Sequence, residues 1–171
     1  MILVFGSGGQ LSKSFQRIYA ENDIFFSSRN DLDLTKSDDI IPYIDKFNPS
    51  CIINFSAFNK VDDAEKNDSN ALKINHEAVS KMASYSYSNS IPIVHFSSDY
   101  VFDGNQDFPY HENDDCNPIN KYGISKFLGE RAIIDSNAQF LIIRTSFLYS
   151  RTSDSFPQVI KKMIENNVEK L

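Results

Sequence analysis

Short apolar runs alternate with longer amphipathic segments along the chain. The apolar runs predict β-strands, which we expect over residues 1–5, 24–26, 51–55, 91–96 and 140–143. The amphipathic segments carry apolar residues at helical spacing and predict helices over residues 10–20, 37–47, 69–88, 121–134 and 156–168. Strand and helix therefore alternate, which is typical of an α/β protein with a doubly wound parallel sheet, the Rossmann fold.

The carboxyl ends of parallel strands lie along one edge of such a sheet, because right-handed crossovers return the chain to the same side. Ligands of these folds bind at that edge. We therefore expect the functional residues in the segments that follow the predicted strands. One of these segments, residues 99–120, is rich in Asp, Asn, Gly and Pro and predicts a long loop of functional or mobile character.

The segment after the first predicted strand reads Gly6-Ser7-Gly8-Gly9. A dinucleotide pyrophosphate needs a tight turn, a close approach of the backbone and the N–H groups of a helix N-terminus. Gly6 and Gly9 fit the first two positions of a G-x-x-G-x-x-G spacing, and the small residue Ser12 takes the third. The pattern favours a dinucleotide site, with an ordinary glycine turn as the open alternative.

The second predicted strand is followed by Ser27-Ser28-Arg29, at the place where a site that prefers NADH usually has Asp or Glu. A hydroxyl beside a guanidinium suits a 2′-phosphate, because arginine holds phosphate with paired, charge-assisted hydrogen bonds. The sequence therefore predicts NADPH as the preferred cofactor, with NADH as the alternative. A merely solvated Arg29 is the competing interpretation.

Tyr122 and Lys126 are four residues apart at the start of a predicted helix and so share one face of it. A phenol has a pKa of about 10 and is a poor acid–base group at neutral pH, but a nearby ammonium lowers that pKa. Tyr122 would then exchange a proton with a carbonyl oxygen while a hydride moves at carbon. Taken alone, the spacing is more simply explained by a surface lysine beside a partly buried tyrosine.

The serine pair Ser97-Ser98, at the end of the fourth predicted strand, changes this balance. A hydroxyl at that edge of the sheet is placed to hydrogen-bond a substrate carbonyl. The glycine turn, the serine and the helix of Tyr122 and Lys126 follow one another in the order that a dehydrogenase requires. Together they make a dehydrogenase-type site our leading hypothesis.

Composition excludes several classes of partner. The chain has 17 basic and 23 acidic side chains, a net charge of −6, and no cluster of more than two Lys or Arg, which argues against a nucleic-acid partner. No apolar run reaches the roughly 18 residues of a membrane span, and no signal peptide is recognisable. Cys51 and Cys116 are too few for a disulfide scaffold, and the three histidines lack metal-ligand spacing. We expect a cytoplasmic protein without a metal, membrane or nucleic-acid partner.

Seven segments of the sequence resemble a known family. They are GSGGQLS (6–12), DLDLTK (31–36), INFSAFNKVDDAE (53–65), ALKINHEAV (71–79), HFSSDYVFDG (95–104), PYHENDDCNPINKYGISKFLGE (109–130) and IIRTSFLYS (142–150). Through them the chain is similar to the extended short-chain dehydrogenase/reductases and, within these, to the sugar-nucleotide-binding dTDP-4-dehydrorhamnose reductases. The segments span nearly the whole chain in the family's order.

The resemblance implies an NADPH-dependent reductase of a 4-keto sugar nucleotide, in the biosynthesis of dTDP-L-rhamnose. The family's catalytic residues match Ser98, Tyr122 and Lys126, with Lys126 also holding the nicotinamide ribose. Its cofactor-binding residues match Gly6, Gly9, Gln10, Leu11, Ser56, Ala57 and Asn75. To the cofactor-binding set we add Ser28 and Arg29, for the reason given above, and Asp33 and Leu34 of the DLDLTK segment.

The sequence departs from the family pattern in two residues and in length. Ser12 replaces the third glycine, and Ser56 stands where alanine is more frequent. Members of the family continue into a smaller domain that closes over the nucleotide-sugar. We expect residues 1–171 to form an NAD(P)-binding Rossmann domain with the C-terminal substrate domain absent or truncated, which leaves the activity of this chain open. Self-association would cover the surface left exposed, so a homo-oligomer is a further expectation.

Two other functions stay open. A nucleotide-sugar epimerase or dehydratase of the same superfamily would hold a tightly bound NAD. A non-catalytic NAD(P)-binding regulatory module would need no substrate domain. The identity of the bound cofactor and the presence of turnover separate these alternatives from a reductase.

Overall fold

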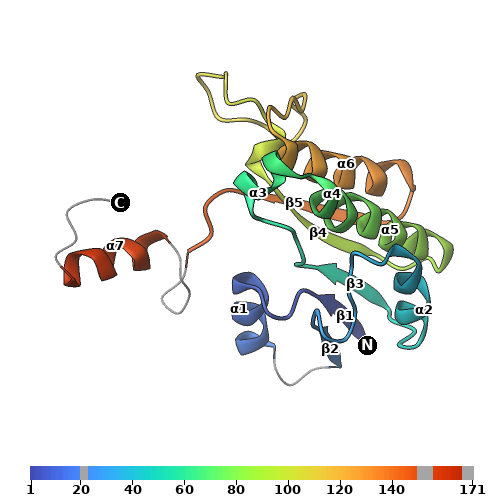
Figure 1. Ribbon diagram of the computed structural model, residues 1–171. Coiled ribbons are helices and arrows are strands. Elements are labelled where there is room, and N and C mark those ends of the chain that lie inside the picture. The colour runs from blue at the N-terminus through green and yellow to red at the C-terminus, as the bar shows by residue number, and fades with distance from the viewer. Residues whose placement is uncertain (20–22, 150–155, 167–171) are drawn as a thin grey trace.

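The computed structural model describes residues 1–19, 23–149 and 156–166. Five strands form one parallel sheet in the order β2-β1-β3-β4-β5, as Figure 1 shows. The strands are β1 (Ile2–Phe5), β2 (Ile24–Ser27), β3 (Cys51–Asn54), β4 (Ile93–Ser98) and β5 (Phe140–Thr145). The strand order reverses between β1 and β3, which creates the crevice at which such sheets bind ligands. The predicted doubly wound parallel sheet is confirmed.

Helices cover both faces of the sheet. The helical elements are α1 (Gln10–Ile18), η1 (Ser37–Asp39), α2 (Ile40–Asp45), α3 (Val61–Lys66), α4 (Ser69–Leu72), η2 (Lys73–Glu77), α5 (Ala78–Ser88), η3 (Asp99–Val101), α6 (Lys121–Asp135) and α7 (Phe156–Glu165). Right-handed crossovers place α2, α5 and α6 on one face and α1 on the other, and Figure 1 shows α5 and α6 side by side. No helix in the described ranges is long and apolar enough to cross a membrane.

The structure corrects several details of the predicted helices. The segment predicted as one helix over residues 69–88 is α4, a π-helical turn (η2) and α5 in succession, and α3 precedes it where no helix was predicted. Ile18, predicted on a buried face, is 73% exposed, because α1 packs through Phe15, whose ring contacts Phe26 and Phe55. Ile41 is exposed beside the buried Ile40 and Ile44. Residues 20, 167 and 168 of the predicted helices lie outside the described residues.

The core forms between the central strands and the α2, α5 and α6 layer. Leu3, Ile52 and Ile93 from the strands pack in one buried cluster with Met82 and Ile133 from the helices. Each such side chain contributes roughly 1.5–3 kcal/mol when it leaves water. The edge strand β5 differs, because its Phe140 and Leu141 are 47% and 55% exposed.

Helix α6 is held close to its neighbours by glycines. A Cβ on Gly123 would collide with the carbonyl oxygen of Tyr100, and a Cβ on Gly129 with that of Asn75. The side chain of Asn120 accepts a hydrogen bond from the N–H of Gly123 (2.7 Å) and caps the helix. Helix α6 is therefore packed closely against η3 and η2.

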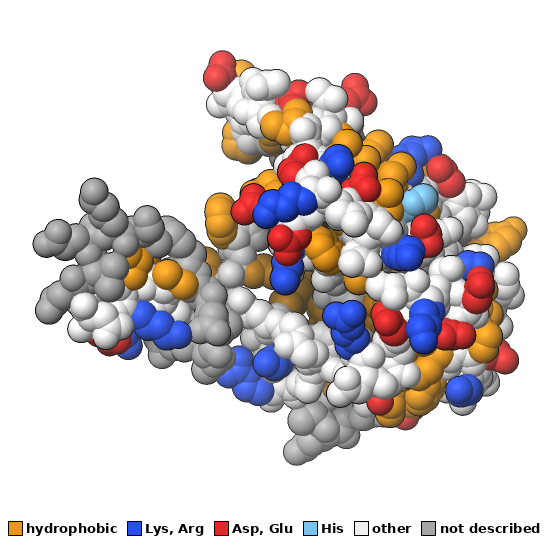
Figure 2. Space-filling view, in the orientation of Figure 1, with side chains coloured by type: hydrophobic (Ala, Val, Ile, Leu, Met, Phe, Trp, Pro, Cys, Tyr) orange, Lys and Arg blue, Asp and Glu red, His pale blue; other side chains and the backbone are white. Residues whose placement is uncertain are grey.

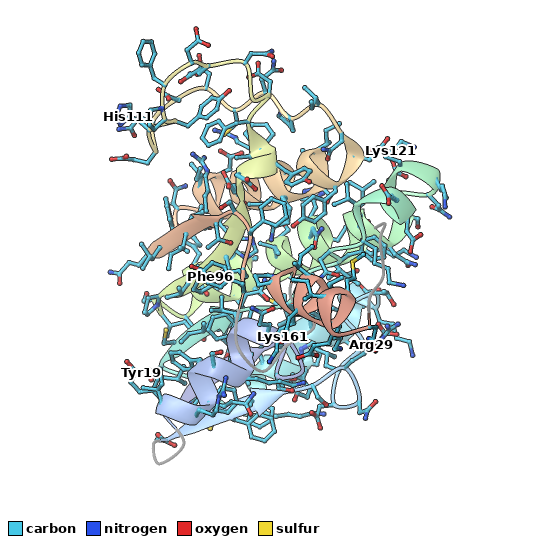
Figure 3. The ribbon with its side chains drawn as sticks, turned by 90° about the vertical axis from the view of Figure 1, so that its left-hand side faces the viewer. Tyr19, Arg29, Phe96, His111, Lys121 and Lys161 are labelled. Carbon is cyan, nitrogen blue, oxygen red and sulfur yellow. The ribbon has the colours of Figure 1, made fainter. Side chains whose placement is uncertain are left out.

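The predicted long loop lies between η3 and α6 and projects from the body of the molecule in Figures 1 and 3. The carboxylate of Asp103 links several parts of this loop. It accepts hydrogen bonds from the backbone N–H of Asn105 (3.0 Å), the side-chain amide of Asn117 (3.0 Å) and the Tyr110 hydroxyl (2.7 Å). These bonds lower the pKa of Asp103 to about 2. On the face in Figure 2, acidic and basic side chains are interspersed over the main body.

Candidate cofactor and catalytic site

A cavity of about 1230 Å³ opens at the carboxyl edge of the sheet. Its wall includes every residue that the sequence predicted for the site except Asn75: Gly6, Gly9, Gln10, Leu11, Ser28, Arg29, Asp33, Leu34, Ser56, Ala57, Ser98, Tyr122 and Lys126. Figure 3 labels two residues of this wall, Arg29 from the loop after β2 and, in addition to the predicted residues, Phe96 from β4. The fold thus brings the predicted cofactor and catalytic residues to one space.

The turn after β1 requires glycine at its first position. Gly6 has φ of 87°, and a Cβ there would lie 2.6 Å from the backbone nitrogen of Ser56. Gly9 is the N-cap of α1 and offers no side chain to the helix N-terminus, and the residues of the first turn, Gln10, Leu11 and Ser12, line the cavity. Ser12 is buried and lines the wall, which shows that serine fits the third position of the motif.

The loop after β2 contains a carboxylate that the motif did not point to. Asp31 accepts hydrogen bonds from the backbone N–H (2.8 Å) and the hydroxyl (2.6 Å) of Ser28, and these bonds lower the pKa of Asp31. The hydroxyl proton of Ser28 is therefore engaged by the protein. The guanidinium of Arg29 stays exposed on the cavity wall. Of the two residues predicted to hold a 2′-phosphate, Arg29 is the better placed.

Asp33 and Leu34 follow in the same loop and face the cavity. The carboxylate of Asp33 accepts from the backbone N–H (3.1 Å) and the hydroxyl (2.9 Å) of Thr35. These bonds lower the pKa of Asp33, and the charges of Arg29 and Lys36 act in the same direction. Asp33 is consequently a fixed anion at the rim of the site.

Ser98, Tyr122 and Lys126 come together at the junction of β4 and α6, and all three are buried. The Ser98 hydroxyl donates to Asp99 (3.1 Å) and accepts from the backbone N–H of Tyr100 (3.3 Å). The ring of Tyr100 packs edge-on to that of Tyr122, with centroids 5.5 Å apart. Burial raises the pKa of Tyr122, while a hydrogen bond with the Ser98 side chain acts in the opposite direction.

The predicted effect of Lys126 on Tyr122 needs correction. The Lys126 ammonium donates to the backbone oxygen of Phe96 (2.7 Å) and lies 3.4 Å from Nε2 of His95. Burial lowers the pKa of Lys126 to about 8. Instead of being lowered by a neighbouring cation, the pKa of Tyr122 is raised, because desolvation is the largest influence on both groups.

Asn75, which the resemblance assigned to the cofactor, is fully buried behind the cavity wall. Its side-chain oxygen accepts from the N–H of Phe58 (2.9 Å), and its amide nitrogen donates to the oxygen of Phe58 (3.0 Å) and to the Ser125 hydroxyl (2.9 Å). The π-helical turn η2 presents it to both partners. Asn75 therefore clamps the loop after β3 to α6, behind the residues that line the cavity.

Two functional candidates were missed in the sequence, Asn54 and His95. Both are fully buried polar residues: Asn54 ends β3 after Ile52 and Ile53, and His95 stands between Val94 and Phe96 in β4. The signal that could have found them is this polarity, since buried polar groups need partners. Further lining residues come from the loops after β3 and β5 and from α3 and α4, among them Asn59, Lys60, Asn67, Asn70, Thr145 and Leu148.

The described residues contain no group of three or more His, Cys, Asp or Glu side chains that could hold a metal ion.

Comparison with known proteins identifies the family of the chain. Residues 1–170 match the family described as RmlD substrate binding domain. The chain belongs to this family.

The relatives of the chain include reductases of known name. The dTDP-4-dehydrorhamnose reductase of Aggregatibacter actinomycetemcomitans is 33% identical over 168 residues, which cover 96% of this chain and 57% of that protein. A probable low-salt glycan biosynthesis reductase of Haloferax volcanii is 35% identical over 145 residues, with 82% and 48% covered. The resemblance seen in the sequence is confirmed.

Solved structures place the fold in the same family. A dTDP-4-dehydrorhamnose reductase from Bacillus anthracis, in complex with NADP, has a TM-score of 0.90 at 31% identity, covering 96% of this chain and 59% of that one. The enzyme WbmG of Bordetella bronchiseptica has a TM-score of 0.83 at 15% identity, which shows the fold alone. The chain spans just over half the length of most of these relatives.

Proposed function

We propose that this chain is the cofactor-binding and catalytic part of a reductase that uses NADPH to reduce the keto group of a 4-keto sugar nucleotide, as in a dTDP-4-dehydrorhamnose reductase. The observation that carries this proposal is the convergence of Ser98, Tyr122 and Lys126 on the cavity that also contains the glycine turn after β1. Family membership and the named relatives support it. Residues 1–171 then act as the NAD(P)-binding domain, in a cytoplasm that keeps the free thiols Cys51 and Cys116 reduced.

The residues of the first half of the wall fit NADPH. Gly6 leaves the space that a Cβ would fill beside Ser56, and the N-terminus of α1, capped by Gly9 without a side chain, suits a pyrophosphate. Arg29 supplies a cation for the 2′-phosphate. When bound, the nicotinamide supplies the hydride that reduces the keto carbon.

The residues of the second half fit the proton transfer that accompanies this reduction. Tyr122 gives its hydroxyl proton to the keto oxygen as that oxygen gains negative charge. Burial raises the pKa of Tyr122, which keeps the phenol protonated but makes it a weaker acid, so the proton transfer depends on the negative charge that develops on the keto oxygen. The Ser98 hydroxyl, which donates to Asp99 in the ligand-free chain, would turn its proton to the same keto oxygen and orient it. By family resemblance, Lys126 holds the nicotinamide ribose.

The test measures binding and hydride transfer separately. NADPH is titrated into the chain by fluorescence, and transfer of deuterium from labelled NADPH to dTDP-4-dehydro-6-deoxy-L-mannose is followed at stoichiometric protein concentration. We expect wild type and Tyr122→Phe to bind NADPH alike, and Tyr122→Phe to lose about 10²–10⁴-fold in transfer rate.

Each other outcome points to a named alternative. NAD that stays bound through purification, without net reduction, supports an epimerase or dehydratase. NADPH binding without any transfer supports a regulatory module. Equal transfer by wild type and Tyr122→Phe contradicts the role of the phenol.

We also propose that copies of the chain self-associate. Exposed apolar side chains at β5 and in the segment after it, Phe140, Leu141 and Phe147, support this proposal. Light scattering at several protein concentrations is expected to show an average mass above 19.5 kDa that rises with concentration. A monodisperse monomer throughout would contradict self-association.

A further inference from the structure

A row of polar side chains crosses the apolar interior directly behind the catalytic wall. It runs from Ser56 after β3, through Asn54 on β3 and His95 on β4, to Lys126 on α6. Asn54 and His95 are fully buried, and Lys126 is 1% exposed. Because polar groups without water depend on their partners, the direction of each hydrogen bond in this row has a definite consequence.

The direction of the first bonds is fixed by a backbone group. The N–H of Ser56 can only donate, and it donates to Oδ1 of Asn54 (2.9 Å), as does the Ser56 hydroxyl. The other end of the Asn54 amide is therefore its NH₂ group, which lies 3.1 Å from Nδ1 of His95. Since NH₂ has no acceptor capacity, Nδ1 of His95 accepts and carries no proton.

The state of the imidazole follows. Burial, together with the charge of Lys126, lowers the pKa of His95 well below its usual range, so the ring is neutral. A neutral imidazole carries one proton, and with Nδ1 accepting, that proton is on Nε2. The Nε2–H group faces Nζ of Lys126 at 3.4 Å.

If Nζ is an ammonium, it and the Nε2–H group are both donors and cannot form a hydrogen bond. A neutral amine at Nζ accepts a hydrogen bond from Nε2–H through its lone pair. The other bond of Nζ, to the oxygen of Phe96 (2.7 Å), is available to both forms. Glu130, one turn further along α6, favours the ammonium, but its carboxylate is paired with Arg144 of β5 (2.7 Å). The charge of Asp99 in η3 acts to raise the pKa of Tyr122, the titratable group at the other end of this face.

We propose that His95 is a positioning residue for the catalytic site: Ser56 and Asn54 fix its tautomer, and its Nε2–H group favours the neutral amine of Lys126. This inference rests on the proposed function in so far as Lys126 serves the reaction. Burial lowers the pKa of Lys126 to about 8, and the Nε2–H group of His95 acts in the same direction, so the positive charge beside the cofactor cavity is present below that pH and lost above it. An ordinary exposed lysine would keep that charge to a pH of about 10.4.

The first test reads the tautomer directly. In the ligand-free chain with ¹⁵N-labelled histidine, long-range ¹H–¹⁵N spectra are expected to show His95 with its proton on Nε2 throughout the pH range in which the chain stays folded. A proton on Nδ1 of His95 in the wild type would overturn the proposal, and this result needs no variant.

The second test follows Lys126 by ¹³C NMR of its ε-carbon across a pH titration. In Asn54→Asp a carboxylate replaces the NH₂ group, so the proton moves to Nδ1 of His95, and Nε2 accepts from Lys126. In His95→Met the opposing N–H group is removed without an added charge. Both changes are expected to raise the Lys126 midpoint by about one pH unit.

The matched control is Asn89→Asp, the same chemical change at an exposed residue after α5, and it is expected to leave the midpoint of Lys126 unchanged. A midpoint that moves in neither Asn54→Asp nor His95→Met overturns the proposal. Both tests use the chain without NADPH or substrate. Their failure is therefore distinct from failure of the proposed function, which would show in NADPH binding and hydride transfer.

Discussion

The two halves of the cavity wall are built in different ways. Around β1, α1 and β2 the wall is mainly backbone, shaped by the positive φ of Gly6 and by the start of α1, with Arg29 exposed at the rim. Around β4 and α6 the wall consists of buried side chains, above all Tyr122 and Lys126. We therefore expect the first half to recognise a ligand by geometry and the second to depend on the desolvation of its side chains.

This difference predicts how each half responds to mutation. A backbone cradle fails when its conformation is blocked, and it is indifferent to side chains that point to water. A desolvated wall responds to any change in hydrogen bonding or charge, because low polarity strengthens both favourable and unfavourable interactions. The four predictions below test this comparison.

The largest effect is expected for Gly6→Val in the backbone cradle. A valine would need a φ that branched residues avoid, and its Cβ would meet the backbone of Ser56 at 2.6 Å. We expect a loss of about 3 kcal/mol in the free energy of unfolding, measured by denaturant titration, together with loss of NADPH binding. Gly8→Ala is the control, since a Cβ on Gly8 meets no atom within 4 Å. Equal losses in both variants would contradict a cradle shaped by Gly6.

Ser98→Ala tests the desolvated half. Its hydroxyl bonds with Tyr122 and with the backbone of Tyr100, so its removal is expected to lower the rate of hydride transfer about 100-fold with little change in NADPH affinity. The control is Ser86→Ala, because the Ser86 hydroxyl is buried without a hydrogen-bond partner among the described residues. A fall in NADPH affinity equal to the fall in rate would show that Ser98 acts on binding.

Lys126→Met tests the cost of the buried ammonium. The pKa of Lys126 is about 8 in the folded protein and higher in the unfolded chain, so the unfolded chain binds more protons between these two values. The penalty is fully present below pH 8 and fades as the pH rises. We expect Lys126→Met to raise the free energy of unfolding by about 2 kcal/mol near pH 7, after allowance for the lost bond to Phe96. At alkaline pH we expect a smaller increase. A gain independent of pH would contradict this account.

The smallest effect is expected for Arg29→Ala. Loss of one exposed guanidinium should weaken NADPH binding about 10-fold and leave NADH binding unchanged, because only NADPH has the 2′-phosphate. Titrations of both cofactors measure it. Arg131→Ala, which removes an exposed arginine paired with Asp135 on α6, is the control. Equal weakening for both cofactors would assign Arg29 a role other than phosphate recognition.

Much of the site could be predicted because it depends on local sequence. The glycine turn follows a strand that is apolar throughout, and Tyr122 and Lys126 are neighbours through helical spacing alone. Asn75 could not be placed, because its role depends on where η2 lies against the loop after β3 and against Ser125. Asp31 differs, because it is three residues from Ser28 and their contact is local; the Ser-x-x-Asp spacing of residues 28–31 is the signal that could have found it.

By itself the sequence determined the alternation of strands and helices and the carboxyl edge at which most of the predicted site residues gather. These follow from periodicity and spacing, which are properties of short segments. Only the tertiary structure decided which groups are desolvated and which partners they have. It raised the pKa of Tyr122, lowered that of Lys126 and set His95 behind them, because burial is the joint result of β3, β4 and α6 packing together.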